Sequence, residues 1–314
     1  MPEAPLSVGV VGVGSMGQHH ARTYREVEDA ELVGVADADE ARATEVAADL
    51  GTDAHAVPDL LEQVDAVSVA VPTHAHDAVA SACIDAGVDA LVEKPFVADP
   101  ERGRELAAAA SDAGVTLQVG HVERFNPVVD AVFDAVEGRE LVSVRADRLG
   151  PPAGRVIPDS VVFDLMIHDV DVVLELAGER PANVDATATA DGEYAVATLE
   201  FDSGLVATLS ASRVSHDSVR ELAVNAEGCG VTADYAAQSV SVTRDDGGAP
   251  DDVTEADPLT RELRSFVDAA ATGASPVVSA DDALRAIDVV REIEAAADLA
   301  DATPPSEETA VDGA

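Results

Sequence analysis

The chain has 314 residues, 47% of them apolar, which is enough for two domains with a core each. Its 61 acidic and 19 basic side chains give a net charge of -42, and no Lys/Arg cluster is present to neutralise nucleic-acid phosphates. The sequence also lacks a run of about 18 apolar residues and a signal-like start. We therefore expect a cytoplasmic protein that binds neither nucleic acid nor a membrane and is adapted to high salt, where counter-ions screen its charge.

The first third alternates short β-branched runs with longer helical patterns, which is typical of a parallel sheet covered by helices. Helices are predicted near 15–28, 39–50, 76–86 and 99–113. The predicted strands end at Gly12, Asp37, Val71, Glu93 and Gly120. This order predicts a doubly wound α/β domain over residues 1–121.

From about residue 140, runs with period-two alternation and short turns predict an open, mostly antiparallel sheet with one face exposed. Helical segments near 161–178, 258–273 and 280–301 accompany this sheet. We expect a second, α+β domain over 122–302, followed by an acidic flexible tail at 303–314.

Directly after the first strand, the segment Gly12-Val13-Gly14-Ser15-Met16-Gly17 fits G-x-G-x-x-G and leads into a helix. Gly12 permits a tight turn, Gly14 lets the backbone approach a pyrophosphate, and Gly17 lets the helix pack close to the strand. The pattern in this position predicts a Rossmann dinucleotide site.

The second strand ends in Asp37, twenty residues beyond Gly17, where a carboxylate can accept hydrogen bonds from ribose hydroxyls. Its charge would repel a 2′-phosphate, and Ala38 and Asp39 supply no cation to receive one. NAD is therefore favoured over NADP.

Lysine occurs once in the chain, as Lys94, between Glu93 and Pro95 at the carboxyl end of a predicted strand. It could be an ordinary ion-pair partner, but ligands of open parallel sheets bind at this end of the strands. Glu93 should point to the opposite face and serve a different task. We assign Lys94 to the active site.

In the helix that begins near Ser160, Asp164 and His168 are four residues apart and project from one face, with Asp171 further along the same stripe. Such a pair is often a surface ion pair or a cap. Here the surrounding residues are almost all apolar, so the helix should be buried and its ionisable groups should face a cleft. A histidine there could remove a hydroxyl proton while a lysine stabilises the alkoxide.

Four further histidines form two close pairs, His19 with His20 and His74 with His76. Neither pair has the setting of a metal site, and we expect no metal. Cys83 and Cys229 lack Cys-x-x-Cys spacing and are interpreted as buried thiols.

Together these segments resemble the Gfo/Idh/MocA family of sugar and cyclitol dehydrogenases over nearly the whole chain. The resemblance is carried by the glycine turn, the segment 71–76, Glu93-Lys94-Pro95, the junction 119–127, and Asp164-x-x-x-His168 with Asp171. It implies that Lys94, Asp164 and His168 are catalytic, with the histidine as proton acceptor. It implies a homo-dimer or homo-tetramer as well. Further cofactor contacts are implied for Ser15, Met16, Val71, Pro72, Thr73, His76 and Glu93, and substrate contacts for His121, Arg124, Asn126 and Asp171.

Within the family, the junction GHVERFNP and the later RLGPPAGR resemble enzymes that oxidise the 3-hydroxyl of UDP-N-acetylglucosamine. Arg124, Arg148 and Arg155 could hold the diphosphate of such a substrate, or could offset neighbouring acidic charge. One departure is Ser160-Val161, where the family usually has Gly-Val. The alternatives are a dehydrogenase of a free sugar or inositol, and an NAD-binding regulatory protein without turnover.

Overall fold

The computed structural model describes residues 5–152, 154, 157, 159–245, 247, 254 and 256–299. Arg155 and the expected tail at 303–314 lie outside the described residues. The chain divides into two compact units. The first consists of Met1–Pro127 and Thr254–Arg285, and the second of Val128–Val253 and Ala286–Ala314.

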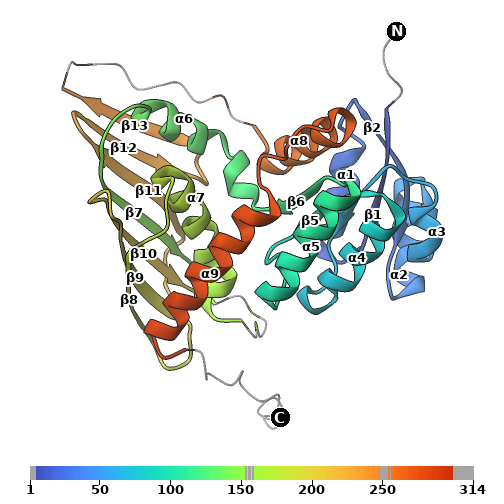
Figure 1. Cartoon of the computed structure of the whole chain (residues 1–314), viewed down its shortest axis with the longest axis horizontal. Coiled ribbons are helices and arrows are strands. Elements are labelled where there is room, and N and C mark those ends of the chain that lie inside the picture. Colours follow the sequence, from blue (N-terminus) through green and yellow to red (C-terminus); the bar gives the residue numbers. More distant parts are fainter. Residues whose placement is uncertain are drawn as a thin grey trace. The chain divides into compact units, whose positions relative to one another are not determined.

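The first unit is built on a six-stranded parallel sheet with the order β3-β2-β1-β4-β5-β6 (Figure 1). Its strands are β1 (Leu6–Val11), β2 (Ala30–Ala36), β3 (Asp53–Ala54), β4 (Ala66–Val69), β5 (Asp89–Glu93) and β6 (Leu117–Gly120). Its helices are α1 (Ser15–Tyr24), α2 (Glu40–Leu50), α3 (Val57–Leu61), α4 (His76–Ala86), α5 (Pro100–Ala113), α8 (Pro258–Thr272) and the short η1 (Thr73–Ala75) and η2 (Val122–Phe125). The doubly wound parallel sheet is confirmed.

Strand alternation distributes the helices over the two faces of this sheet. Val8 and Val10 of β1 face a core that also contains side chains of α1, α2 and α8. Gly9 between them faces the opposite side, where an added Cβ would meet Leu60 of α3 at 3.0 Å.

Helix α8 follows the Asp257 cap, which accepts a hydrogen bond from Thr260 N. It returns to this unit because Leu263, Phe266 and Val267 recur at helical spacing and pack into the core of the first sheet.

The second unit contains a seven-stranded sheet with the order β13-β12-β11-β7-β10-β9-β8. Its strands are β7 (Leu141–Leu149), β8 (Asn183–Ala188), β9 (Tyr194–Glu200), β10 (Val206–Ser212), β11 (Val219–Ala226), β12 (Cys229–Asp234) and β13 (Ser239–Arg244). All neighbours are antiparallel except β7 and β10, which are parallel, so the expected mostly antiparallel sheet is confirmed.

Buried and exposed side chains alternate along β9, β10 and β12, as expected for a sheet with one covered face. Helices α6 (Pro127–Val136) and α7 (Ile167–Ala177) lie on the covered face (Figure 1). A π turn, η3 (Val162–Met166), leads directly into α7. Helix α9 spans Ala280–Ala296. None of the helices within the described ranges is long and apolar enough to span a membrane.

Candidate functional site

The glycine turn between β1 and α1 has a distinct local reason for each glycine. Gly12 has φ +88°, and a Cβ there would lie 2.7 Å from the backbone of Ala70. At Gly17 a Cβ would lie 1.8 Å from the carbonyl oxygen of Gly12, so only glycine lets α1 start this close to the strand. At Gly14 a Cβ would meet no atom within 4 Å. The turn is therefore packed behind Gly12 and Gly17 and open at Gly14.

The start of α1 fits an anionic ligand. Gly14 is the N-cap and supplies no side-chain cap, and no acidic residue stands in the first turn. Ser15 is exposed, and Met16 is 47% exposed. The free backbone N–H groups and the positive end of the helix dipole match a pyrophosphate, and the open space at Gly14 permits its approach.

Asp37, directly after β2, fixes the glycine turn as well as offering a carboxylate. Its Oδ2 accepts a hydrogen bond from Val13 N at 2.8 Å, and its Oδ1 accepts one from Asp39 N at 2.9 Å. The guanidinium of Arg42, on α2, lies 3.6 Å from Asp37 and 3.5 Å from Asp39. Sequence reasoning missed Arg42 because it considered only the two residues after Asp37.

After β4, the segment from Val71 to Thr73 is partly exposed, whereas His76 is buried. The Nε2 of His76 lies 2.9 Å from the carbonyl oxygen of Val71, and its Nδ1 lies 3.0 Å from that of Pro95. An N–H on either nitrogen donates to a carbonyl group. His76 thus ties the segment after β4 to the segment that follows Lys94.

Glu93 ends β5 beside Lys94 and turns into the first unit. One carboxylate oxygen lies 2.9 Å from Nε2 of His20 on α1, and the other accepts a hydrogen bond from the backbone N of Lys94 at 3.2 Å. Burial raises the pKa of this carboxyl, but the hydrogen bond from His20 and the charge of Lys94 outweigh burial and lower it. Glu93 is therefore ionised at neutral pH.

The junction after β6 brings further polar groups to Lys94. His121 is 1% exposed. Burial, with the charges of Lys94 and Arg124 adding to it, lowers its pKa to about 3, so its imidazole is neutral at pH 7. Asn126 is also buried and donates to Glu123 at 3.3 Å. The structure thus brings Lys94, His121 and Arg124 together at the carboxyl ends of β5 and β6.

In the second unit, Asp164 and His168 are half-buried in a helix whose apolar neighbours are almost all buried. Asp164 belongs to the π turn and His168 to the first turn of α7. Arg213, which follows β10 and is 5% exposed, holds its Nη1 3.8 Å from the Asp164 carboxylate and its Nε 3.2 Å from Glu193. Sequence reasoning missed Arg213, although a cation retained in so acidic a chain was the available signal.

Asp171 is buried on α7. Arg148 is 3% exposed, and its Nε and Nη2 donate to the two carboxylate oxygens of Asp169 at 2.8 and 2.9 Å. Its guanidinium lies 5.6 Å from the centre of the Tyr235 ring. The two hydrogen bonds between Arg148 and Asp169 join β7 to α7.

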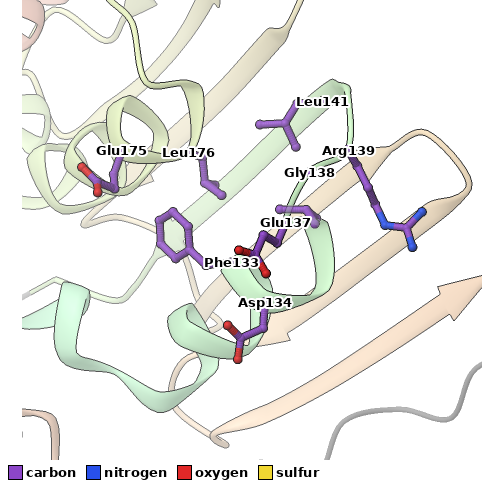
Figure 2. Close-up of a pocket in the computed structure, with 9 residues that line it drawn as sticks. Phe133, Asp134, Glu137, Gly138, Arg139, Leu141, Glu175 and Leu176 are labelled. Atoms are coloured by element: carbon purple, nitrogen blue, oxygen red, sulfur yellow. The ribbon is translucent and has the colours of Figure 1, made fainter.

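Two other features of the described residues bear on ligand binding. Figure 2 shows a pocket of about 360 Å³ in the second unit, and none of the predicted site residues lines it. Its lining comes from the end of α6, the turn into β7 and the end of α7: Phe133, Asp134, Val136, Glu137, Gly138, Arg139, Leu141, Glu175 and Leu176. In the first unit, His20, Glu93 and Glu262 have ligand atoms within 4.8 Å of one another.

Comparison with known protein families gives two matches. Residues 6–121 match an oxidoreductase family with an NAD-binding Rossmann fold, and residues 142–229 match the GFO/IDH/MocA C-terminal domain.

Among individual proteins, the chain is 34% identical over 281 residues to a UDP-N-acetylglucosamine 3-dehydrogenase of Acidithiobacillus ferrooxidans, covering 85% of this chain and 89% of the relative. A solved structure of UDP-N-acetylglucosamine 3-dehydrogenase from that organism has a TM-score of 0.90 at 31% identity, with 94% of this chain and 98% of that chain covered. An inositol 2-dehydrogenase of Saccharopolyspora erythraea is 35% identical over 296 residues, covering 85% of this chain and 87% of the relative.

Proposed function

The chain belongs to the Gfo/Idh/MocA family of NAD-binding oxidoreductases, and on this premise we propose that it oxidises a secondary hydroxyl of a nucleotide sugar, with the 3-hydroxyl of UDP-N-acetylglucosamine as the first candidate. The observation that carries the proposal is the first unit's parallel sheet. At its carboxyl edge it presents both an open glycine turn and the sole lysine of the chain.

The proposed chemistry uses three side chains on one substrate hydroxyl. The imidazole of His168 accepts the hydroxyl proton, the Lys94 ammonium stabilises the developing alkoxide, and Asp164 orients the reacting groups. Arg213 holds the Asp164 carboxylate in place. When bound, NAD supplies the hydride acceptor.

A nucleotide sugar also needs cations for its diphosphate. Arg124 is the half-buried candidate in the first unit, beside Lys94 and His121. The buried guanidinium of Arg148 is bound to Asp169 through Nε and Nη2, so its proposed contribution is to hold α7 in place rather than to bind the diphosphate. His121 and Asn126 complete the polar lining proposed at the junction after β6, and Asp171 that of α7.

For the cofactor, we propose NAD in preference to NADP. The Asp37 carboxylate already binds the glycine turn through Val13 N, so it is fixed where a 2′-phosphate would meet its charge. Arg42 faces both Asp37 and Asp39, and two carboxylates largely offset its charge. Comparable kcat/KM with both cofactors would overturn this preference.

A second candidate is oxidation of inositol or a free sugar, which the similarity to inositol 2-dehydrogenases favours. The test is initial-rate measurement with NAD and a panel of UDP-N-acetylglucosamine, myo-inositol and free N-acetylglucosamine. The proposal expects the highest kcat/KM for the nucleotide sugar. A higher value for myo-inositol would replace it with the second candidate.

We also propose that the protein works at high salt as a homo-dimer or homo-tetramer, supported by the net charge of -42 and by the exposed face of the second sheet. The melting temperature should rise from millimolar to molar salt, and sedimentation should give a mass above that of one chain. A melting temperature that does not change with salt would contradict the proposed adaptation to high salt. A monomer in molar salt would contradict the proposed homo-oligomer.

A further inference from the structure

Three ionisable side chains, from α1, β5 and α8, meet inside the first unit and form what we call the buried carboxyl cluster. They are His20 of α1, Glu93 of β5 and Glu262 of α8. His20 and Glu262 are fully buried, and the Glu93 side chain is 15% exposed. Their ligand atoms lie within 4.8 Å of one another. Two carboxyl groups so close in a protein interior cannot both carry a charge without a large cost.

The hydrogen bonds of the cluster are unequal. Glu93 is bound on both oxygens, by His20 and by the backbone N of Lys94. Neither carboxyl oxygen of Glu262 has a hydrogen-bond partner among the described residues. An ionised carboxylate buried without partners is far more costly than a neutral acid, so the geometry places the negative charge on Glu93.

The surroundings of Glu262 favour the same distribution. Burial, and then the Glu93 charge, raise the pKa of Glu262 well above its ordinary value. Tyr24, one helical turn after His20, is fully buried, and its hydroxyl lies 2.8 Å from Ser68 Oγ. Burial raises the pKa of Tyr24 and outweighs the Ser68 hydrogen bond, so this neighbour of Glu262 is an uncharged phenol. The elements around Glu262 carry the following titratable and charged groups: His19, His20, Arg22 and Tyr24 of α1, Glu93 and Lys94 at the carboxyl end of β5, Glu123 and Arg124 of η2, and Arg261, Arg264 and Asp268 of α8 itself.

We propose that Glu262 is held as the neutral acid in the folded protein, so that the buried carboxyl cluster carries a single negative charge, on Glu93, which positions the Lys94 ammonium. This inference rests on the proposed role of Lys94 in the reaction. Glu262 is then a positioning residue, because its proton decides how much negative charge stands beside Lys94. If Glu262 lost that proton, a second buried charge would repel Glu93 and displace the groups that it holds.

Infrared spectroscopy tests the charge distribution without any turnover. At pH 8 the parent protein should show a protonated carboxylic-acid C=O band, and Glu262→Gln should abolish it. The matched control is Asp268→Asn, an exposed acid on the same helix, which should keep the band. A parent spectrum without the band, or a band that survives Glu262→Gln, would overturn the inference. So would a band that emerges only after chelator treatment, since that would mean that a cation had held Glu262 ionised.

The pH dependence of kcat tests the positioning role. Above neutrality, kcat of the parent should fall as Glu262 loses its proton, and in Glu262→Gln this fall should move to higher pH while KM for the sugar stays the same. Glu93→Gln, which removes the charge itself, should lower kcat at every pH. If kcat falls over the same alkaline pH range in the parent and in Glu262→Gln, the positioning role is refuted. A protein with the infrared band but no dehydrogenase activity would refute the proposed function alone.

Discussion

Alanine at two glycines of the same turn should affect different properties. At Gly14 it should weaken cofactor binding, and at Gly17 it should lower the stability of the fold. Gly14 has φ -66° and ψ -162°, which alanine adopts without strain, and its Cβ would meet no atom within 4 Å. Reduced freedom of the unfolded chain gains about 0.4–1 kcal/mol, and the poorer N-cap costs a similar amount, so the free energy of unfolding should change by less than about 1 kcal/mol. The new methyl group would occupy the space that the pyrophosphate is proposed to approach. A clash of about 1–3 kcal/mol weakens NADH binding by a factor of about 5–150.

Gly17→Ala is the contrasting variant. Its Cβ would lie 1.8 Å from the carbonyl oxygen of Gly12, so α1 must move away from the strand. We expect a loss of about 3 kcal/mol or more, which corresponds to a melting temperature lower by at least about 6 °C.

The assay is NADH fluorescence titration together with thermal unfolding in molar salt. Gly150→Ala is the matched control, because Gly150 also has open space and no left-handed φ, and both measurements should stay at the parent values. Parent-like NADH affinity in Gly14→Ala, with its stability unchanged, would refute the assignment of this turn as the pyrophosphate site.

Two further predictions concern buried ionisable groups. Arg148→Met should lower the free energy of unfolding by about 3–5 kcal/mol, because it leaves the buried Asp169 without the Arg148 guanidinium. Adding Asp169→Leu should recover most of this loss. A double variant no more stable than Arg148→Met would contradict the prediction. For His121, the folded pKa of about 3 means that the unfolded chain binds the proton first as pH falls below about 6.5. The parent should therefore lose about 1.5 kcal/mol between pH 6.5 and 5 that His121→Gln does not lose, measured by denaturant unfolding, and parallel pH curves would show that the imidazole is not held neutral.

The sequence predicts well those elements whose pattern of apolar residues can be recognised within a few consecutive positions. Strands such as β1 and β5 are mainly apolar; Gly12 follows β1 and Glu93 ends β5, and both strands fall where expected. The two-residue β3 and the five-residue α3 are too short to show a period. Strand β12 is short and begins with Cys229-Gly230, which hides its alternation. The amphipathic pattern of α8 predicts a helix but does not say which sheet it covers.

The residues of the candidate site also differ in how well the sequence predicts them. The left-handed turn at Gly12 and the exposed start of α1 follow from neighbouring residues, so the motif alone predicts them. The contacts of Arg213 with Asp164 and of Glu262 with Glu93 join residues far apart in the chain, and no spacing rule relates them. Sequence reasoning therefore located the groups proposed to react but missed those that set their charge and orientation.

The central claim is that Lys94 acts on the reacting hydroxyl, and Lys94→Met tests it most directly. With NAD and UDP-N-acetylglucosamine in molar salt, kcat should fall by at least about 100-fold, the effect typical of removing a group that stabilises developing charge. NADH affinity, measured on the same preparation, should stay within about threefold of the parent value. A variant that binds NADH and oxidises the sugar at the parent rate would contradict the account.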